Sequence, residues 1–162
     1  MTNHRELIVT FYTAFQQLDH AAMNRCYSED AVFFDPVFGL LQGDAVKAMW
    51  EMLCVNARDF SLVFSNINEL DGEYVTCEWV ASYTFSGTGR KVVNQVKANM
   101  RFAGGQIIEH SDAFSLHQWS KQALGNTGVL FGWNSFFQRR IKNQATRKLQ
   151  YFMKKKAEEN GG

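Results

Sequence analysis

The sequence has few cysteines and no long apolar run, and both shortages limit what the protein can be. Its 162 residues include the three cysteines Cys26, Cys54 and Cys77, none in a CxxC pair or at a zinc-like spacing from histidine. Neither a disulfide framework nor a zinc site is indicated, and a reducing, cytoplasmic setting is expected. No window reaches the roughly 18 apolar residues of a membrane-spanning helix, so we expect a soluble chain.

Several motifs that would indicate a function are also missing. Gly-rich phosphate loops, Ser/His/Asp motifs and internal repeats are absent, as are recognised DNA-binding patterns. We therefore expect no cofactor, no metal and no nucleic-acid partner. What the sequence does contain is apolar material, because 46% of its residues are hydrophobic and 14% are aromatic. That is enough to fill the core of one domain.

The order of the apolar patterns indicates the fold class. Residues at helical spacing predict three helices, over Glu6–Leu18, Asp19–Tyr27 and Ala45–Asn56. A short β-branched and aromatic run, Asp30–Phe38, predicts a strand. Four long alternating runs follow, with turn signals between them: Phe60–Leu70, Glu73–Phe85, Lys91–Phe102 and Gln106–Leu116. We predict an α+β domain, in which N-terminal helices pack in a strongly curved antiparallel sheet and leave a cone-shaped hollow.

A carboxylate in an apolar stretch is the first candidate site residue. Asp35 precedes Pro36 in the run Tyr27–Val37, and its neighbours include Phe33, Phe34 and Phe38. Loss of water there would raise the pKa of Asp35 toward the range of a general base. Asp before Pro is also common in turns, where the carboxylate caps backbone amides. Tyr12, on the first predicted helix, is either a hydrogen-bond donor in the same pocket or a core aromatic.

Three segments resemble a known superfamily. They are Phe11–Asp19, Tyr27–Val37 and Gly43–Val46, and together with the order of elements they resemble the nuclear transport factor 2-like fold. That superfamily, also described as cystatin-like, includes ketosteroid isomerases and SnoaL-like polyketide cyclases. The resemblance covers roughly residues 4–118, a typical single-domain span.

The resemblance implies roles for the two candidates. In ketosteroid isomerases, which are also a general example of pKa tuning, a carboxylate before proline is the base and a tyrosine on the first helix stabilises the oxyanion. Asp35 and Tyr12 match these motifs. The second oxyanion donor of that family would align near Ala98, where the sequence has no acid. Losing one such donor usually costs about 10²–10³ in rate, so the resemblance does not carry over steroid isomerase activity.

A second polar pair lies on the last predicted strand. The two-residue spacing places His110 and Asp112 on the same strand face as Ile108 and Phe114. SnoaL-like proteins often carry a similar Glu-His-x-Asp run. The pair could orient or relay a proton. The alternative is a structural hydrogen bond, because most buried polar pairs satisfy one another.

Two functions follow as hypotheses. One is a cofactor-independent isomerase, cyclase or hydratase that acts on a small apolar carbonyl compound, with Asp35 as base, Tyr12 at the oxyanion and His110 with Asp112 in support. The other is a non-catalytic module for ligand binding or dimerisation. In either case the predicted ligand-binding residues are Phe34, Phe38, Trp50, Met100 and Phe114.

The last quarter of the chain has a different composition. Residues 133–157 hold eight Lys or Arg and no acid, whereas 1–132 hold nine against fourteen acids. We predict a nuclear transport factor 2-like domain over 1–118 and a helical extension over 119–162, with a short helix, an apolar Gly-punctuated loop and a basic helix over 138–156. Charge attraction favours docking of that helix on its own body. Contact with a membrane surface or nucleic acid is the alternative.

We also expect a homodimer that forms through the sheets. The reason is apolar residues assigned to the outer faces of the strands. These residues are Val63, Trp79, Phe85, Met100 and Phe114.

Overall fold

Two capped helices open the structure. The computed structural model describes residues 3–161. Helix α1 (His4–Gln16) begins at Asn3, whose side chain accepts a hydrogen bond from the Arg5 amide, and α2 (His20–Arg25) begins at Asp19. Such caps satisfy amides that would otherwise lack a partner at the helix N-terminus. The apolar face of α1 is buried, as its spacing predicts.

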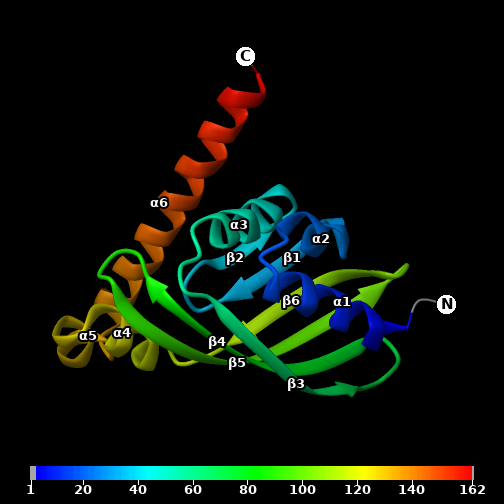
Figure 1. The fold of residues 1–162 in the computed structure, drawn as a ribbon, viewed down its shortest axis with the longest axis horizontal. Coiled ribbons are helices and arrows are strands. Elements are labelled where there is room, and N and C mark those ends of the chain that lie inside the picture. The colour runs from blue at the N-terminus through cyan, green and yellow to red at the C-terminus, as the bar shows by residue number, and fades with distance from the viewer. Residues whose placement is uncertain (1–2, 162) are drawn as a thin grey trace.

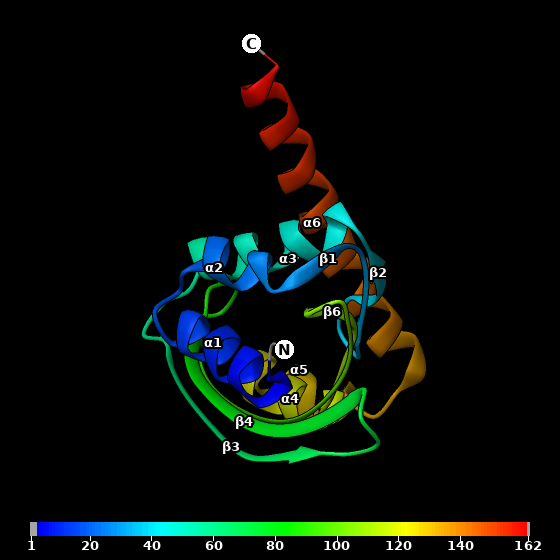
Figure 2. The same ribbon diagram turned by 90° about the vertical axis from the view of Figure 1, so that its right-hand side faces the viewer.

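One curved sheet wraps around α1. Its strands are β1 (Tyr27–Asp35), β2 (Gly39–Gln42), β3 (Ser61–Glu69), β4 (Tyr74–Phe85), β5 (Arg90–Ala103) and β6 (Gln106–Ala113), and α3 (Asp44–Val55) follows β2. The strand order is β2-β1-β6-β5-β4-β3. Figure 1 shows the long strands running beneath the helices, and Figure 2 shows how strongly they curve around α1. The predicted α+β class and the curved sheet are confirmed.

The topology differs from a simple meander in one pairing. Strand β1 runs parallel to β6, with Phe33 opposite His110, whereas the other neighbouring strands pair antiparallel. This pairing is long-range in sequence, so local turn signals do not predict it. Strand β2 was also missed, because it is four residues long and half of a tight hairpin at Gly39. Gly39 has a positive φ of 70° there, a conformation that glycine adopts readily.

The inner face of the sheet contains residues that the sequence pattern had assigned to the outer face. Trp79 and Met100 are buried in the core, and Phe85 and Phe114 pack in the apolar cluster that contains Leu116 and Trp119. Val63 is exposed on the other face, as predicted. A two-residue period separates the two faces of a strand but does not say which one is inside. The assignment of the other four to an outer dimer face is therefore wrong.

Three helices follow the sheet. They are α4 (Leu116–Leu124), α5 (Asn126–Phe131) and α6 (Ser135–Asn160). The segment predicted as an apolar loop contains α5, which passes so close to α4 that a Cβ on Gly128 would lie 1.9 Å from the Ser120 carbonyl oxygen. Only glycine fits at such a crossing. The glycine that suggested a loop is thus a packing residue.

Helix α6 contacts the body along one side. Ile141 packs with Leu116 and Trp119, and Leu149 belongs to the main core beside α3. Lys156 forms an ion pair with Glu51 of α3. Beyond this contact the helix projects from the rest of the molecule (Figure 1). Over residues 3–161, no helix combines the length and apolar character needed to span a bilayer.

Candidate functional site

A cavity of about 280 Å³ lies inside the curved sheet. Its walls come from α1, α3, β4 and the C-terminal helices α4 and α6, and most of its lining side chains are apolar or aromatic. Asp35 and Asp112 are the acids among them. An apolar hollow with a few polar groups is the usual form of a small-molecule site.

Asp35 ends β1 and points into this cavity while capping a turn. Its Oδ1 accepts hydrogen bonds from the amides of Val37 at 2.8 Å and Phe38 at 2.6 Å. Burial raises the pKa of the carboxyl to about 7, although donation by the two amides lowers it. Charge repulsion from Asp112 contributes to this value by raising the pKa. Asp35 therefore caps the turn and lines the cavity at the same time.

Tyr83, on β4, places a hydroxyl in the same cavity. The Trp119 indole donates a hydrogen bond to the Tyr83 oxygen at 2.8 Å. Within residues 3–161 the hydroxyl proton has no acceptor of its own, so it is free to be donated to a ligand. Burial raises the pKa of Tyr83, the Trp119 hydrogen bond lowers it, and the nearby Asp35 charge raises it. The Asp35 carboxyl and the Tyr83 hydroxyl therefore line the same cavity.

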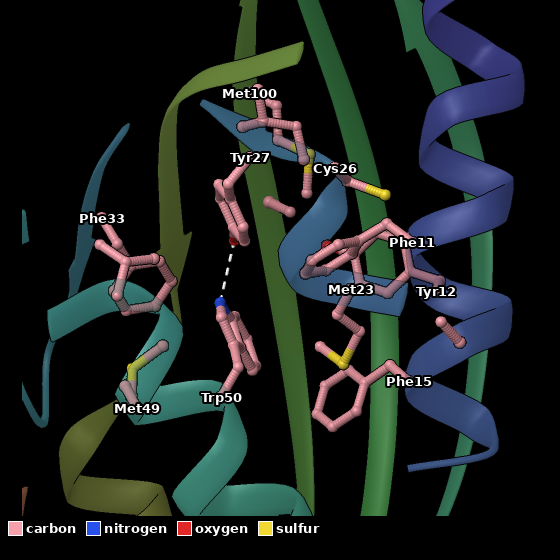
Figure 3. Packing of buried hydrophobic residues seen from close by; sticks show 14 of the residues in the cluster. Phe11, Tyr12, Phe15, Met23, Cys26, Tyr27, Phe33, Met49, Trp50 and Met100 are labelled. Carbon is pink, nitrogen blue, oxygen red and sulfur yellow. Dashed lines mark hydrogen bonds between the residues drawn. The ribbon is translucent and has the colours of Figure 1, made fainter. Parts of the chain in front are cut away.

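A buried polar chain runs behind the cavity. Trp50 donates to the Tyr27 hydroxyl at 3.0 Å, as Figure 3 shows, and that hydroxyl lies 2.5 Å from His110 Nδ1. His110 Nε2 lies 2.8 Å from Asp112 Oδ1. Trp79 approaches the same oxygen at 3.5 Å. The chain therefore links α3 through β1 and β6 to the cavity wall at Asp112.

Hydrogen-bond bookkeeping assigns the proton positions in this chain. The Tyr27 oxygen accepts from Trp50, and among residues 3–161 the Tyr27 proton has no acceptor other than His110 Nδ1, to which it is donated. His110 is then the neutral tautomer with its proton on Nε2, which it donates to the Asp112 carboxylate. A doubly protonated ring would leave the Tyr27 proton without an acceptor. Every group in the chain is satisfied in this arrangement, which favours one rigid geometry.

Tyr12 lies apart from the cavity. Its ring is fully buried, stacks on Phe64 and contacts Trp79. Its hydroxyl has no hydrogen-bond partner among residues 3–161, and burial raises its pKa. The structure brings Asp35 and Asp112 to one cavity, connects His110 to them through Asp112, and does not bring Tyr12 to the cavity wall.

Of the five predicted ligand-binding residues, some line the cavity and others lie away from it. Phe38, Trp50 and Phe114 line the cavity. Phe34 is 45% exposed on the other side of β1, and Met100 is buried in the core away from the cavity. We therefore leave Phe34 and Met100 out of the site.

Sequence reasoning missed Tyr83, Trp119 and Tyr27. Tyr83 follows Trp79 and Ala81 at two-residue spacing on β4, so the alternation could have placed it on the inner face. Trp119 lies in the C-terminal extension, which the sequence did not connect to the site. Tyr27 lies in the run around Asp35, and nothing in the sequence signals its contact with His110.

In the part of the chain that the structure describes, the cavity lining includes one cation, and no cluster of side chains is suited to a metal ion. Lys148 of α6 is the only cation lining the cavity within the described residues, and its Nζ lies 5.8 Å from the centre of the Phe85 ring. Over residues 3–161, no group of three or more His, Cys, Asp or Glu is arranged to hold a metal ion.

Solved structures with a similar fold bind small molecules. A protein from Catenulispora acidiphila with a ketosteroid isomerase-like fold, in complex with trimethylamine, matches with a TM-score of 0.64 at 17% identity, covering 73% of this chain and 92% of its own. TerC, co-crystallised with polyporic acid, matches with a TM-score of 0.63 at 15% identity. The match covers 74% of this chain and 97% of TerC. These likenesses establish the fold alone.

A candidate polyketide cyclase from Xanthomonas campestris is similar as well. It matches with a TM-score of 0.62 at 22% identity, over 74% of this chain and 95% of its own. A search of curated protein sequences finds no match. The model of the SnoaL-like domain matches residues 8–110, which is more than half of the chain. The chain therefore belongs to the SnoaL-like domain family, within the nuclear transport factor 2-like fold.

Proposed function

We propose that the protein is a cofactor-independent isomerase, cyclase or hydratase for a small apolar carbonyl compound. The observation that carries the proposal is that Asp35 and Tyr83 share the wall of one apolar cavity. Asp35 holds its carboxylate in place through Oδ1 and two backbone amides, which leaves Oδ2 to take a proton. A base with a pKa near 7 is suited to proton transfer at neutral pH.

Tyr83 replaces Tyr12 as the proposed oxyanion donor. When Asp35 removes a proton next to a carbonyl, negative charge develops on the carbonyl oxygen. The free Tyr83 proton can stabilise that charge, and the Trp119 hydrogen bond makes the hydroxyl a better donor. His110 acts as a positioning residue, since it holds Asp112 at the cavity wall.

The relatives support the ligand class. Trimethylamine and polyporic acid occupy proteins of the same fold, and a candidate polyketide cyclase is among them. The apolar wall formed by Trp50, Phe38 and Phe114 suits a small, largely apolar ligand.

Deuterium exchange tests the proposal without knowledge of the natural substrate. A panel of small cyclic ketones is incubated with the protein in D2O, and NMR follows deuterium at the carbon next to the carbonyl. The native protein should catalyse exchange for ketones that bind, and Asp35→Asn should abolish exchange while leaving binding intact. Binding without exchange by the native protein would instead support the second candidate.

That second candidate is a non-catalytic ligand-binding or dimerisation module. The observation in its favour is that Asp35 Oδ1 already caps the turn at Val37 and Phe38, which a purely structural aspartate would also do. In that case the native protein should bind ketones without catalysing exchange, and Asp35→Asn should change ligand affinity little, because an amide oxygen can accept the same two hydrogen bonds.

A further inference from the structure

A cluster of large apolar side chains is exposed where α5 meets α6. Each of its members has more than half of its surface accessible, and they fall within eight consecutive positions: Val129, Leu130, Phe131, Trp133 and Phe136. Scattered exposed apolar residues are ordinary, whereas a contiguous group of this kind marks an interaction surface. We call these five residues the corner patch.

The side of α6 that faces away from the body continues this patch. Ile141 and Leu149 mark the docked side of the helix. At helical spacing, the opposite side carries two exposed aromatics and several exposed cations: Phe136, Arg139, Arg140, Arg147, Tyr151 and Lys154. We call these six residues the outward stripe.

The cations of the outward stripe are uncompensated. Within residues 3–161, the ion pairs of the molecule involve Arg101, His110 and Lys156, and none includes a cation of the stripe. Residues 133–157 contain no acid. Over the outward stripe, from Phe136 to Lys154, α6 therefore presents positive charge away from the body, and the two acids of the helix, Glu158 and Glu159, follow beyond the stripe.

We propose that the corner patch and the outward stripe bind the surface of an anionic phospholipid bilayer. Trp, Phe and Leu side chains insert at the boundary between headgroups and acyl chains, and cations beside them attract anionic headgroups. Binding of nucleic acid would explain the exposed cations but not the exposed apolar side chains of Val129 and Leu130. The proposal departs from the expectation that α6 docks on its own body alone, because only one side of the helix is used for that contact.

The same helix also forms part of the cavity wall. Ile141, Gln144, Ala145 and Lys148 of α6 line the cavity, on the other side from the outward stripe. A bilayer bound to the stripe would lie one helix diameter, about 10 Å, from the cavity lining. Membrane binding would then place the cavity next to a reservoir of apolar molecules.

Tryptophan fluorescence gives a direct test with the full chain. Trp50, Trp79 and Trp119 are buried, whereas Trp133 is 67% exposed, so a blue shift on vesicle binding reports on Trp133. We expect the shift with phosphatidylcholine vesicles that contain phosphatidylglycerol and a much weaker one with pure phosphatidylcholine. Raising the salt to about 0.5 M should weaken binding several-fold, since it shortens the range of charge attraction.

Matched variants separate the patch from non-specific charge. Arg140→Gln with Arg147→Gln should reduce binding to anionic vesicles by about 25-fold, at about fivefold per cation. Lys91→Gln with Lys97→Gln removes the same charge from exposed positions on β5 and should change binding little. Trp133→Ser with Phe136→Ser should abolish vesicle co-sedimentation, and an unchanged melting temperature would show that this variant is folded.

Three results would overturn the proposal. They are equal binding to neutral and anionic vesicles, an equal loss in the Lys91 and Lys97 control, and no binding to either vesicle. If light scattering shows an oligomer that Trp133→Ser with Phe136→Ser dissociates, and vesicles do not bind, the corner patch is a contact between copies of this chain.

Discussion

The Trp119 indole of the C-terminal extension donates a hydrogen bond to the Tyr83 hydroxyl on β4, with 2.8 Å between nitrogen and oxygen. This contact orients the hydroxyl and leaves its proton for a ligand in the cavity. It also makes the extension part of the site, because Trp119, Ile141 and Lys148 all line the same cavity.

Tyr83→Phe should lower the rate of ketone exchange by about 10²–10³, the usual cost of losing one oxyanion donor. Ligand affinity should change little, because the ring remains. Trp119→Phe should produce a smaller loss of rate, since the hydroxyl stays but loses its orienting donor. Exchange kinetics with calorimetric binding would separate the two effects, and an unchanged rate in Tyr83→Phe would remove Tyr83 from the mechanism.

The exchange rate should rise with pH through about 7 and level off above it. Asp35 acts as a base only when ionised, and burial raises its pKa to about 7. A rate profile between about pH 5 and pH 9 on a bound ketone gives the apparent pKa directly. A flat profile would mean that another group removes the proton.

Asp35→Asn should stabilise the protein at alkaline pH. The unfolded carboxyl has a pKa near 4, whereas burial raises that of the folded carboxyl to about 7. Between these values the unfolded state releases its proton and the folded state keeps it, so native stability falls as pH rises through this window and is level above it. Urea unfolding near pH 8 should show Asp35→Asn more stable by about 2–4 kcal/mol, at 1.36 kcal/mol per pKa unit. Near pH 4 the two proteins should be equal, and a difference there would contradict the explanation.

Tyr27→Phe should destabilise the protein by about 1–3 kcal/mol, because His110 Nδ1 and the Trp50 indole lose their buried partner. Tyr151→Phe is the matched control, since Tyr151 is exposed on α6. Urea unfolding at neutral pH measures both. Equal stability of the two variants would show that the buried chain contributes little.

Truncation before Ser135 should lower the melting temperature by about 10 °C, since burial of Ile141 and Leu149 is worth several kcal/mol. The dye ANS should then bind the uncovered cavity. Truncation after Ala157 is the control, because it removes only exposed residues among those described. Unchanged melting after the larger truncation would mean that α6 contributes nothing to the fold.

The sequence predicted the helices and long strands well, because apolar spacing is a local property. Asp35 also followed from local context, since its apolar neighbours indicate burial. The contacts of Tyr83 with Trp119 and of Tyr27 with His110 could not be predicted, because each joins elements that only the folded sheet brings together. Trp79 and Met100 show a different failure, since alternation does not say which face of a strand is inside.

The parallel pairing of β1 with β6 has a consequence for how the chain is made. Val32 lies opposite Glu109 in this pairing, so the centre of the sheet cannot close until almost all of the sheet has left the ribosome. Bringing such distant residues together costs loop-closure entropy before their contacts stabilise the fold. This cost slows folding. Until β6 arrives, the inner edge of β1 is an unpaired strand edge that can join other chains. The nascent protein is therefore most prone to aggregation just before its last strand is synthesised.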